Sequence, residues 1–193
     1  MKNAIIVFLV LIVLGLGGWF VYDKMQPTAT TSNDTTTTSQ TGSQASTAGV
    51  LDYSSKGLTS VGSDIYNQTA TTTLLLSNNS IRTLPSQMGK MTRLQVLKLD
   101  HNILDGSLIG EVRMMPLTTL DVSYNNMTGM PAEIGQLNKL VSLNYSYNKI
   151  TGLPNELANL KNNLKTFDLT GNPLSASEIS KLKASLPNTN IIF

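Results

Sequence analysis

The residues that could do acid–base or nucleophilic chemistry gather in one stretch of the chain. Asp100, His101 and Asp121 could form an acid–base group, and Ser123 supplies a hydroxyl close to them in sequence. The chain has one histidine and no cysteine, which excludes a cysteine nucleophile, a disulfide and a zinc site built from several such residues. Acid–base catalysis also needs a pocket and a shifted pKa, and exposed carboxylates on a shallow surface offer neither. We therefore expect no enzyme activity, no cofactor and no metal.

Ring side chains recur at one position of a repeating pattern. His101, Tyr124 and Tyr147 each precede an asparagine, and they follow one another at a constant step along the chain. If their segments are neighbouring strands about 4.8 Å apart, the rings form a ridge ~10 Å long. Exposed, rigid rings are good anchors for a ligand. The rings could instead only pack one strand against the next, and both interpretations stay open.

Polar side chains run beside these rings in two further columns of the pattern. One column consists of Asp52, Lys98, Asp121, Asn144 and Asp168, and Asp100 with several serines forms the other. Together with the rings they make up the candidate ligand-binding set. Its members are His101, Tyr124, Tyr147, Lys98, Asp100, Asp121, Asn144 and Asp168.

These columns arise because the sequence repeats with a nearly fixed period. One asparagine marks each repeat: Asn79, Asn102, Asn125, Asn148 and Asn172. All steps between them are equal except the last, which is longer by a single position. A period of this size indicates a solenoid. Each turn reads L-x-x-L-x-L-x-x-N-x-L, which predicts a short half-buried strand followed by a bend that the Asn amide stabilises. We count six turns from Val50 onward, the first with Lys56 in place of Asn.

This skeleton continues as "LPSQMGKM" (84–91), "MPAEIGQL" (130–137) and "LPNELANL" (153–160), and so resembles the leucine-rich repeat. The nearest variety carries L-P-x-x-I-G-x-L. The resemblance implies an α/β fold, a right-handed solenoid with a parallel sheet on its concave face. It also implies that ligands, usually proteins, bind on that face. The absence of cysteine-bearing caps favours a bacterial protein.

Two parts of the repeat region depart from the pattern. The third turn, residues 101–115, lacks the Leu-Pro step and carries Leu-Asp-Gly-Ser-Leu, so we expect a change of backbone there. At the far end, Ser175 and Glu178 have the spacing of a capping box, and Pro187 ends an amphipathic run. Residues 175–193 are therefore predicted to form a helical cap.

The chain before the repeats has two compositions. Residues 1–25 include an uncharged stretch, Ala4 to Tyr22, long enough for a transmembrane anchor of ~28 Å. Lys2 on the N-terminal side predicts a cytoplasmic N-terminus. A cleaved signal peptide is the alternative. Residues 26–49, rich in Thr and Ser, predict a disordered linker that leads into the repeat domain, 50–193.

Charge narrows the class of partner. From Val50 onward 12 Lys or Arg stand against 10 Asp or Glu, which argues against nucleic-acid binding. We therefore expect a single-pass membrane protein whose repeat domain, outside the cytoplasm, recognises a protein, peptide or glycan at the cell envelope without catalysis. A structural scaffold without a diffusible ligand, or a secreted effector if the leader is cut, are the alternatives.

Overall fold

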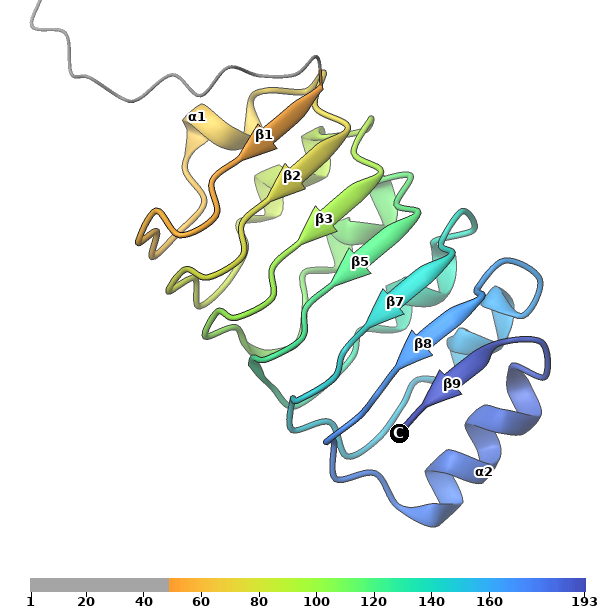
Figure 1. The fold of residues 1–193 in the computed structure, drawn as a ribbon. Coiled ribbons are helices and arrows are strands. Elements are labelled where there is room, and N and C mark those ends of the chain that lie inside the picture. The colour runs from red at the N-terminus through yellow and green to blue at the C-terminus, as the bar shows by residue number, and fades with distance from the viewer. Residues whose placement is uncertain (1–48) are drawn as a thin grey trace, which may run out of the picture. The chain divides into compact units, whose positions relative to one another are not determined.

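The computed structural model describes residues 49–193 (Figure 1). The predicted anchor and nearly all of the predicted linker, residues 1–48, lie outside the described residues. Within 49–193, no helix has the length and hydrophobicity needed to cross a bilayer.

Seven strands form one parallel sheet in the order β1-β2-β3-β5-β7-β8-β9. The strands are β1 (Val50–Asp52), β2 (Thr73–Leu75), β3 (Val96–Lys98), β5 (Thr119–Asp121), β7 (Ser142–Asn144), β8 (Thr166–Asp168) and β9 (Asn190–Ile192). The register follows the sequence period, so that Leu97 lies beside Leu120 and Leu120 beside Leu143. The parallel sheet predicted from the repeat is confirmed.

Short helices run along the other side of the core (Figure 1). They are α1 (Ser63–Tyr66) and the 3-10 helices η1 (Ser86–Lys90), η2 (Gly110–Met114), η3 (Ala132–Gln136) and η4 (Asn155–Leu160). Pro85, Pro131 and Pro154 precede three of them in an extended conformation. Proline fixes φ and lacks an N–H, so it suits the start of a helix. In these three turns the proline thus marks where the chain begins its return.

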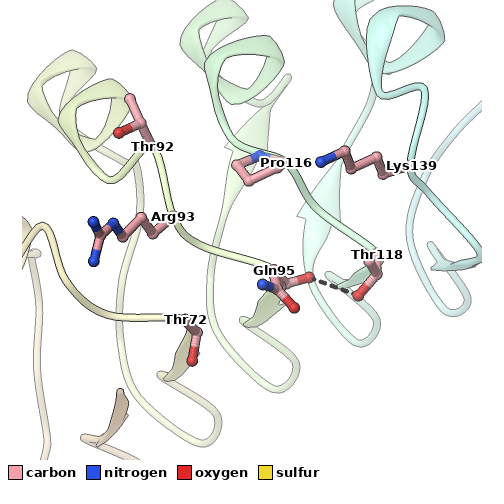
Figure 2. A pocket seen from close by; sticks show the side chains of 7 residues that line it. All are labelled: Thr72, Thr92, Arg93, Gln95, Pro116, Thr118 and Lys139. Carbon is pink, nitrogen blue, oxygen red and sulfur yellow. Dashed lines mark hydrogen bonds between the residues drawn. The ribbon is translucent and has the colours of Figure 1, made fainter. Parts of the chain in front are cut away.

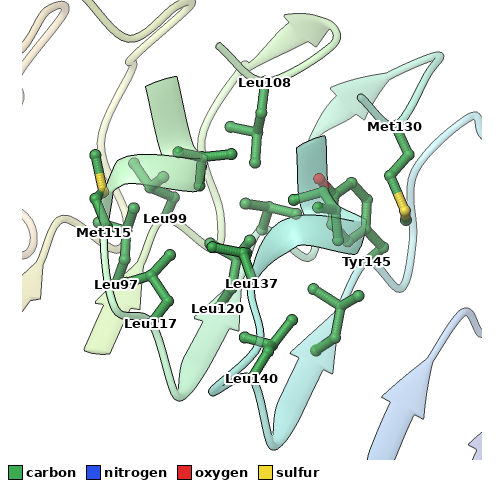
Figure 3. Packing of buried hydrophobic residues seen from close by; sticks show 14 of the residues in the cluster. Leu97, Leu99, Leu108, Met115, Leu117, Leu120, Met130, Leu137, Leu140 and Tyr145 are labelled. Atoms are coloured by element: carbon green, nitrogen blue, oxygen red, sulfur yellow. The ribbon is translucent and has the colours of Figure 1, made fainter. Parts of the chain in front are cut away.

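The core is a continuous row of apolar side chains between sheet and helices (Figure 3). One column of the pattern shows its depth, since all five members are 1% exposed or less: Leu76, Leu99, Val122, Tyr145 and Leu169. Ile65 of α1 and Leu182 of α2 belong to the same buried cluster, and Leu51, Tyr53 and Ile191 at its two ends are partly buried against it. Residues 49–193 therefore contain one continuous hydrophobic core.

The third turn differs as its sequence predicts. Asp105–Gly106 (β4) pairs in parallel with Asn126–Met127 (β6) to form a second, two-stranded sheet. Gly106 has φ +69°, a left-handed conformation that glycine adopts without strain.

The C-terminal cap corrects one prediction and adds a strand. The helix α2 (Ala176–Ser185) begins as expected, because the Ser175 hydroxyl accepts the Glu178 N–H at 3.2 Å. The second half of the predicted capping box is wrong: the Glu178 carboxylate instead accepts from the Leu153 N–H and from Lys181. After α2 the chain returns as β9 and completes the sheet, which the apolar pattern alone did not predict.

Candidate binding face of the sheet

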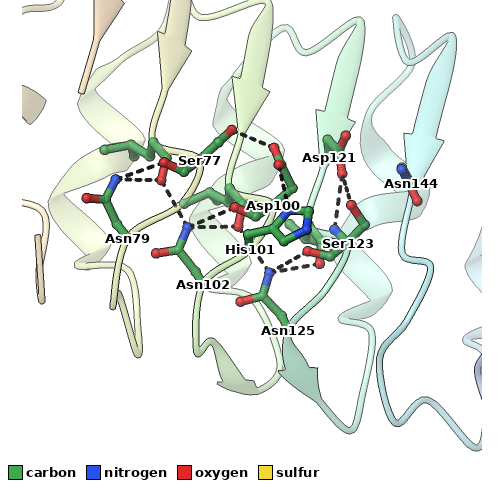
Figure 4. A network of polar contacts seen from close by, with 12 residues as sticks. Ser77, Asn79, Asp100, His101, Asn102, Asp121, Ser123, Asn125 and Asn144 are labelled. Carbon is green, nitrogen blue, oxygen red and sulfur yellow. Dashed lines mark hydrogen bonds and ion pairs between the residues drawn. The ribbon is translucent and has the colours of Figure 1, made fainter. Parts of the chain in front are cut away.

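Each repeated asparagine holds the bend at the end of a strand, and Figure 4 shows three of them, Asn79, Asn102 and Asn125. The Asn125 amide donates to Val122 O and to Leu99 O of the preceding turn, each at 3.0 Å, and its oxygen accepts the Leu104 N–H at 2.8 Å. The other asparagines of the set bond in the same way. The amide therefore ties each turn to the one before it. Lys56 occupies the first turn, which has no earlier turn in the described part of the chain.

The bend places the residue before each asparagine in the left-handed region. Its φ lies between +52° and +75° in every turn, at Ser55, Asn78, His101, Tyr124, Tyr147 and Gly171. This conformation costs an ordinary residue about 1–2 kcal/mol and is an outlier for a bulky one. Asn78 and Gly171, whose types tolerate it, stand at either end of the three rings. Sequence reasoning missed this strain, although Asn and Gly in one column were a signal for it.

The three rings stack on one another, and we name them the aromatic ridge (His101, Tyr124 and Tyr147). Ring centroids are 4.3 Å apart between His101 and Tyr124 and 4.4 Å apart between Tyr124 and Tyr147, with interplanar angles of 14° and 18°. A Cβ added to Gly171 would lie 2.9 Å from Tyr147 Cδ1, so the last ring covers that glycine. The ring faces are thus largely occupied. The two tyrosines are nonetheless 45% and 48% exposed, through their edges and hydroxyls.

Asp100 orients the first ring of the aromatic ridge. Its Oδ2 lies 3.1 Å from His101 Nδ1, and its Oδ1 accepts the Ser77 hydroxyl at 2.5 Å. Burial acts to raise the pKa of Asp100, but the hydrogen bonds from Ser77 and His101 outweigh it and hold the pKa below its ordinary value. The carboxylate therefore stays ionised beside the imidazole at neutral pH.

The side chains of Asp121, Asn144 and Asp168 stabilise the same bends. One side-chain oxygen of each accepts the N–H two residues on, at distances between 2.9 and 3.1 Å. Lys98 stands in the same column, exposed and in no ion pair within residues 49–193. Leu75 interrupts the column between Asp52 and Lys98. The structure therefore brings all eight candidate residues to one sheet face, beside or within the aromatic ridge.

The same geometry gives no support for catalysis. The Ser123 hydroxyl donates to Asp121 at 2.7 Å, and no hydrogen bond links it to His101, so serine and histidine do not form a nucleophile–base pair. Among residues 49–193, no group of three or more His, Asp or Glu could hold a metal ion.

Comparison with known proteins agrees with this fold. Residues 116–174 match the family model described as leucine rich repeat. A leucine-rich repeat protein of Leptospira interrogans is similar, with 28% identity, a TM-score of 0.56, and coverage of 70% of this chain and 40% of that one. No curated protein sequence matches the chain.

Two receptor kinases of Arabidopsis thaliana are similar as well. The ectodomain of GASSHO1/SCHENGEN3 has 32% identity and a TM-score of 0.62 over 74% of this chain, and HAESA has 28% identity and the same score over 75%. The chain spans only 18% and 25% of those two structures. Residues 49–193 thus have the fold of a leucine-rich repeat solenoid, and residues 116–174 also match that family in sequence.

Proposed function

We propose that the sheet face with the aromatic ridge binds an extended peptide or a segment of a protein. The observation that carries this proposal is the strain at the ridge. Other turns place Ser, Asn or Gly at the same left-handed position, so the fold itself does not require rings there. Ring stacking offsets part of the strain, since each stacked pair contributes about 0.5–1.5 kcal/mol. The remaining strain gives the sheet no benefit, and strained residues are commonly found at binding sites.

The stacking favours a peptide over a glycan. Sugars pack against the open faces of aromatic rings, and in the aromatic ridge those faces lie against one another. The ring edges and the two phenolic hydroxyls remain exposed, and the neighbouring carboxylates of Asp121 and Asp168 are partly exposed. These groups suit the amides and cationic side chains of a peptide.

The similar structures support the same choice of ligand. The GASSHO1/SCHENGEN3 ectodomain is in complex with CASPARIAN STRIP INTEGRITY FACTOR 2, and HAESA is in complex with the peptide hormone IDA and the co-receptor SERK1. A protein or peptide partner is therefore in keeping with this kind of solenoid.

The setting we propose is the outer side of a bacterial membrane. The uncharged stretch Ala4 to Tyr22 would span the bilayer once with the N-terminus in the cytoplasm, and residues 26–49 would tether the solenoid to it. The face would then meet ligands of the cell envelope.

The test uses a displayed peptide library panned against residues 49–193, followed by affinity measurements on the selected peptides. The double variant Tyr124→Ser and Tyr147→Ser should weaken binding at least about tenfold, because anchors that pack at an interface contribute about 1.4 kcal/mol or more. Serine is compatible with the fold, since Ser55 holds the same conformation in the first turn. Circular dichroism checks that the variant stays folded.

The matched control removes exposed apolar side chains away from the ridge. Met114 is 51% and Val141 44% exposed, and neither belongs to the candidate set. Met114→Ser with Val141→Ser should leave the affinity unchanged. Equal binding by wild type and the tyrosine variant would refute the proposed site, and glycans that bind in place of peptides would refute the proposed ligand.

A further inference from the structure

Half of the cations in the repeat region lie in one set of loops. Each segment runs from the last residue or two of a short helix through the loop to the next strand, at 90–95, 113–118, 136–141 and 160–165, and we name these segments together the strand-start rim. They contain six cations, all exposed, and no Asp or Glu: Lys90, Arg93, Arg113, Lys139, Lys161 and Lys165. The nearly balanced net charge of the repeat region does not reveal this local excess of cations.

The parallel sheet brings these loops side by side. Because β3, β5, β7 and β8 pair in register, the loops before them follow one another along a single edge of the solenoid. Arg93 and Lys139, from the first and third loops, line the same shallow depression of about 390 Å³ (Figure 2). Arg113 and Lys139 line the adjoining one. The cations therefore share one continuous, open surface.

No cation of the strand-start rim forms an ion pair within the described part of the chain. The two ion pairs among residues 49–193 join His101 to Asp100 and Lys181 to Glu178. Glu111, Glu133 and Glu156 lie on the neighbouring short helices, and the six cations of the rim outnumber them. The rim therefore has an excess of positive charge and attracts anions.

The N-terminal segment joins the solenoid at this same rim. Gly49 O accepts the N–H of Thr72 at 2.8 Å, and Thr72 also lines the depression that Arg93 and Lys139 share. The chain before Gly49 is therefore attached to the solenoid on its strand-start side. A broad basic surface near the point of attachment is more complementary to an extended anionic surface than to a compact anionic ligand.

We propose that the strand-start rim docks on the anionic phospholipid headgroups of the membrane. This proposal rests on the membrane display proposed above for its setting. Docking through the rim leaves the sheet face clear of the bilayer, so the aromatic ridge stays open to its ligand. The attraction is electrostatic and is weakened by salt.

The test is sedimentation of residues 49–193 with vesicles of phosphatidylcholine, with and without phosphatidylglycerol. This fragment contains the continuous hydrophobic core and lacks the uncharged stretch, so the anchor cannot carry the binding. We expect it to bind only the anionic vesicles. Each cation lost should weaken partitioning roughly fivefold, so Arg93→Gln, Arg113→Gln and Lys139→Gln together should weaken it about a hundredfold.

The matched control removes three exposed cations from the opposite, strand-end side, with Lys56→Gln, Arg82→Gln and Lys149→Gln. It has the same net charge and should still bind anionic vesicles within a few-fold of wild type. Equal losses in the two triple variants, or no binding by wild type, would overturn the proposal. Binding to soluble polyphosphate but not to vesicles would overturn it in favour of an anionic polymer.

The two proposals can fail separately. The rim variant should keep its affinity for ridge-selected peptides, and the Tyr124 and Tyr147 double variant should keep its affinity for vesicles. A rim variant that also loses the peptides would mean that the two surfaces are one site, which contradicts the rim proposal.

Discussion

At the scale of single residues, two tyrosines in one turn have opposite environments. Tyr147 is half exposed on the aromatic ridge, whereas Tyr145 is fully buried in the column otherwise filled by Leu and Val. The Tyr145 hydroxyl has no hydrogen-bond partner among the described residues. Burial raises the pKa of Tyr145 far above its ordinary value, so the hydroxyl stays neutral. An unpartnered buried hydroxyl costs stability.

Replacing Tyr145 with Phe should therefore stabilise the protein. Removal of an unsatisfied buried group should raise the free energy of unfolding by about 1–2 kcal/mol. Urea unfolding of residues 49–193 measures it. Tyr66→Phe, at a half-buried position outside the core row, is the control and should change stability by less than about 0.5 kcal/mol. A destabilised Tyr145→Phe variant would show that the hydroxyl has a partner.

The sequence predicted residue neighbours better than residue conformations. The constant step of the repeat is enough to place His101 beside Tyr124, because parallel strands in register convert sequence period into spatial order. The left-handed backbone under each ring depends on the asparagine bend, whose hydrogen bonds join two turns. A pattern of apolar residues does not encode those bonds.

At the scale of elements, glycine sets how closely the short helices pack. A Cβ added to Gly135 of η3 would lie 2.6 Å from the backbone carbonyl carbon of Glu156 in η4. Two elements can approach this closely only where no side chain intervenes. Gly135 is thus a packing requirement between η3 and η4.

Gly135→Ala should force η3 and η4 apart and destabilise the protein by about 1–3 kcal/mol, the usual cost of overpacking. Gly152→Ala is the matched control, because a Cβ there meets nothing within 4 Å. Thermal unfolding followed by circular dichroism compares the two variants. If both melt at the temperature of wild type, the close approach of η3 and η4 is wrong.

The elements also differ in how far the sequence predicted them. The strands of the regular turns followed from the L-x-L step, and the change of backbone in the third turn appeared as β4 and β6. β9 was missed because residues 190–192 lack the apolar spacing of a repeat. It forms because α2 returns the chain to the open edge of β8, where Leu169 N donates to Ile192 O at 2.8 Å.

At the scale of the whole solenoid, function depends on how charge and rings are distributed over its surfaces. The repeat gives every turn a sheet side and a strand-start side, so one residue type repeated at one position becomes a continuous surface. The overall charge predicted no nucleic-acid partner and could not reveal the basic rim, because that rim exists only once the loops are aligned.

The central claim is that the aromatic ridge is the recognition surface, and hydrogen–deuterium exchange of residues 49–193 with a selected peptide tests it most directly. Exchange should slow in the segments around the three rings, 98–102, 121–125 and 144–148, and stay unchanged in η1 to η4. Slower exchange confined to the helical side, with the ring segments unaffected, would contradict the account.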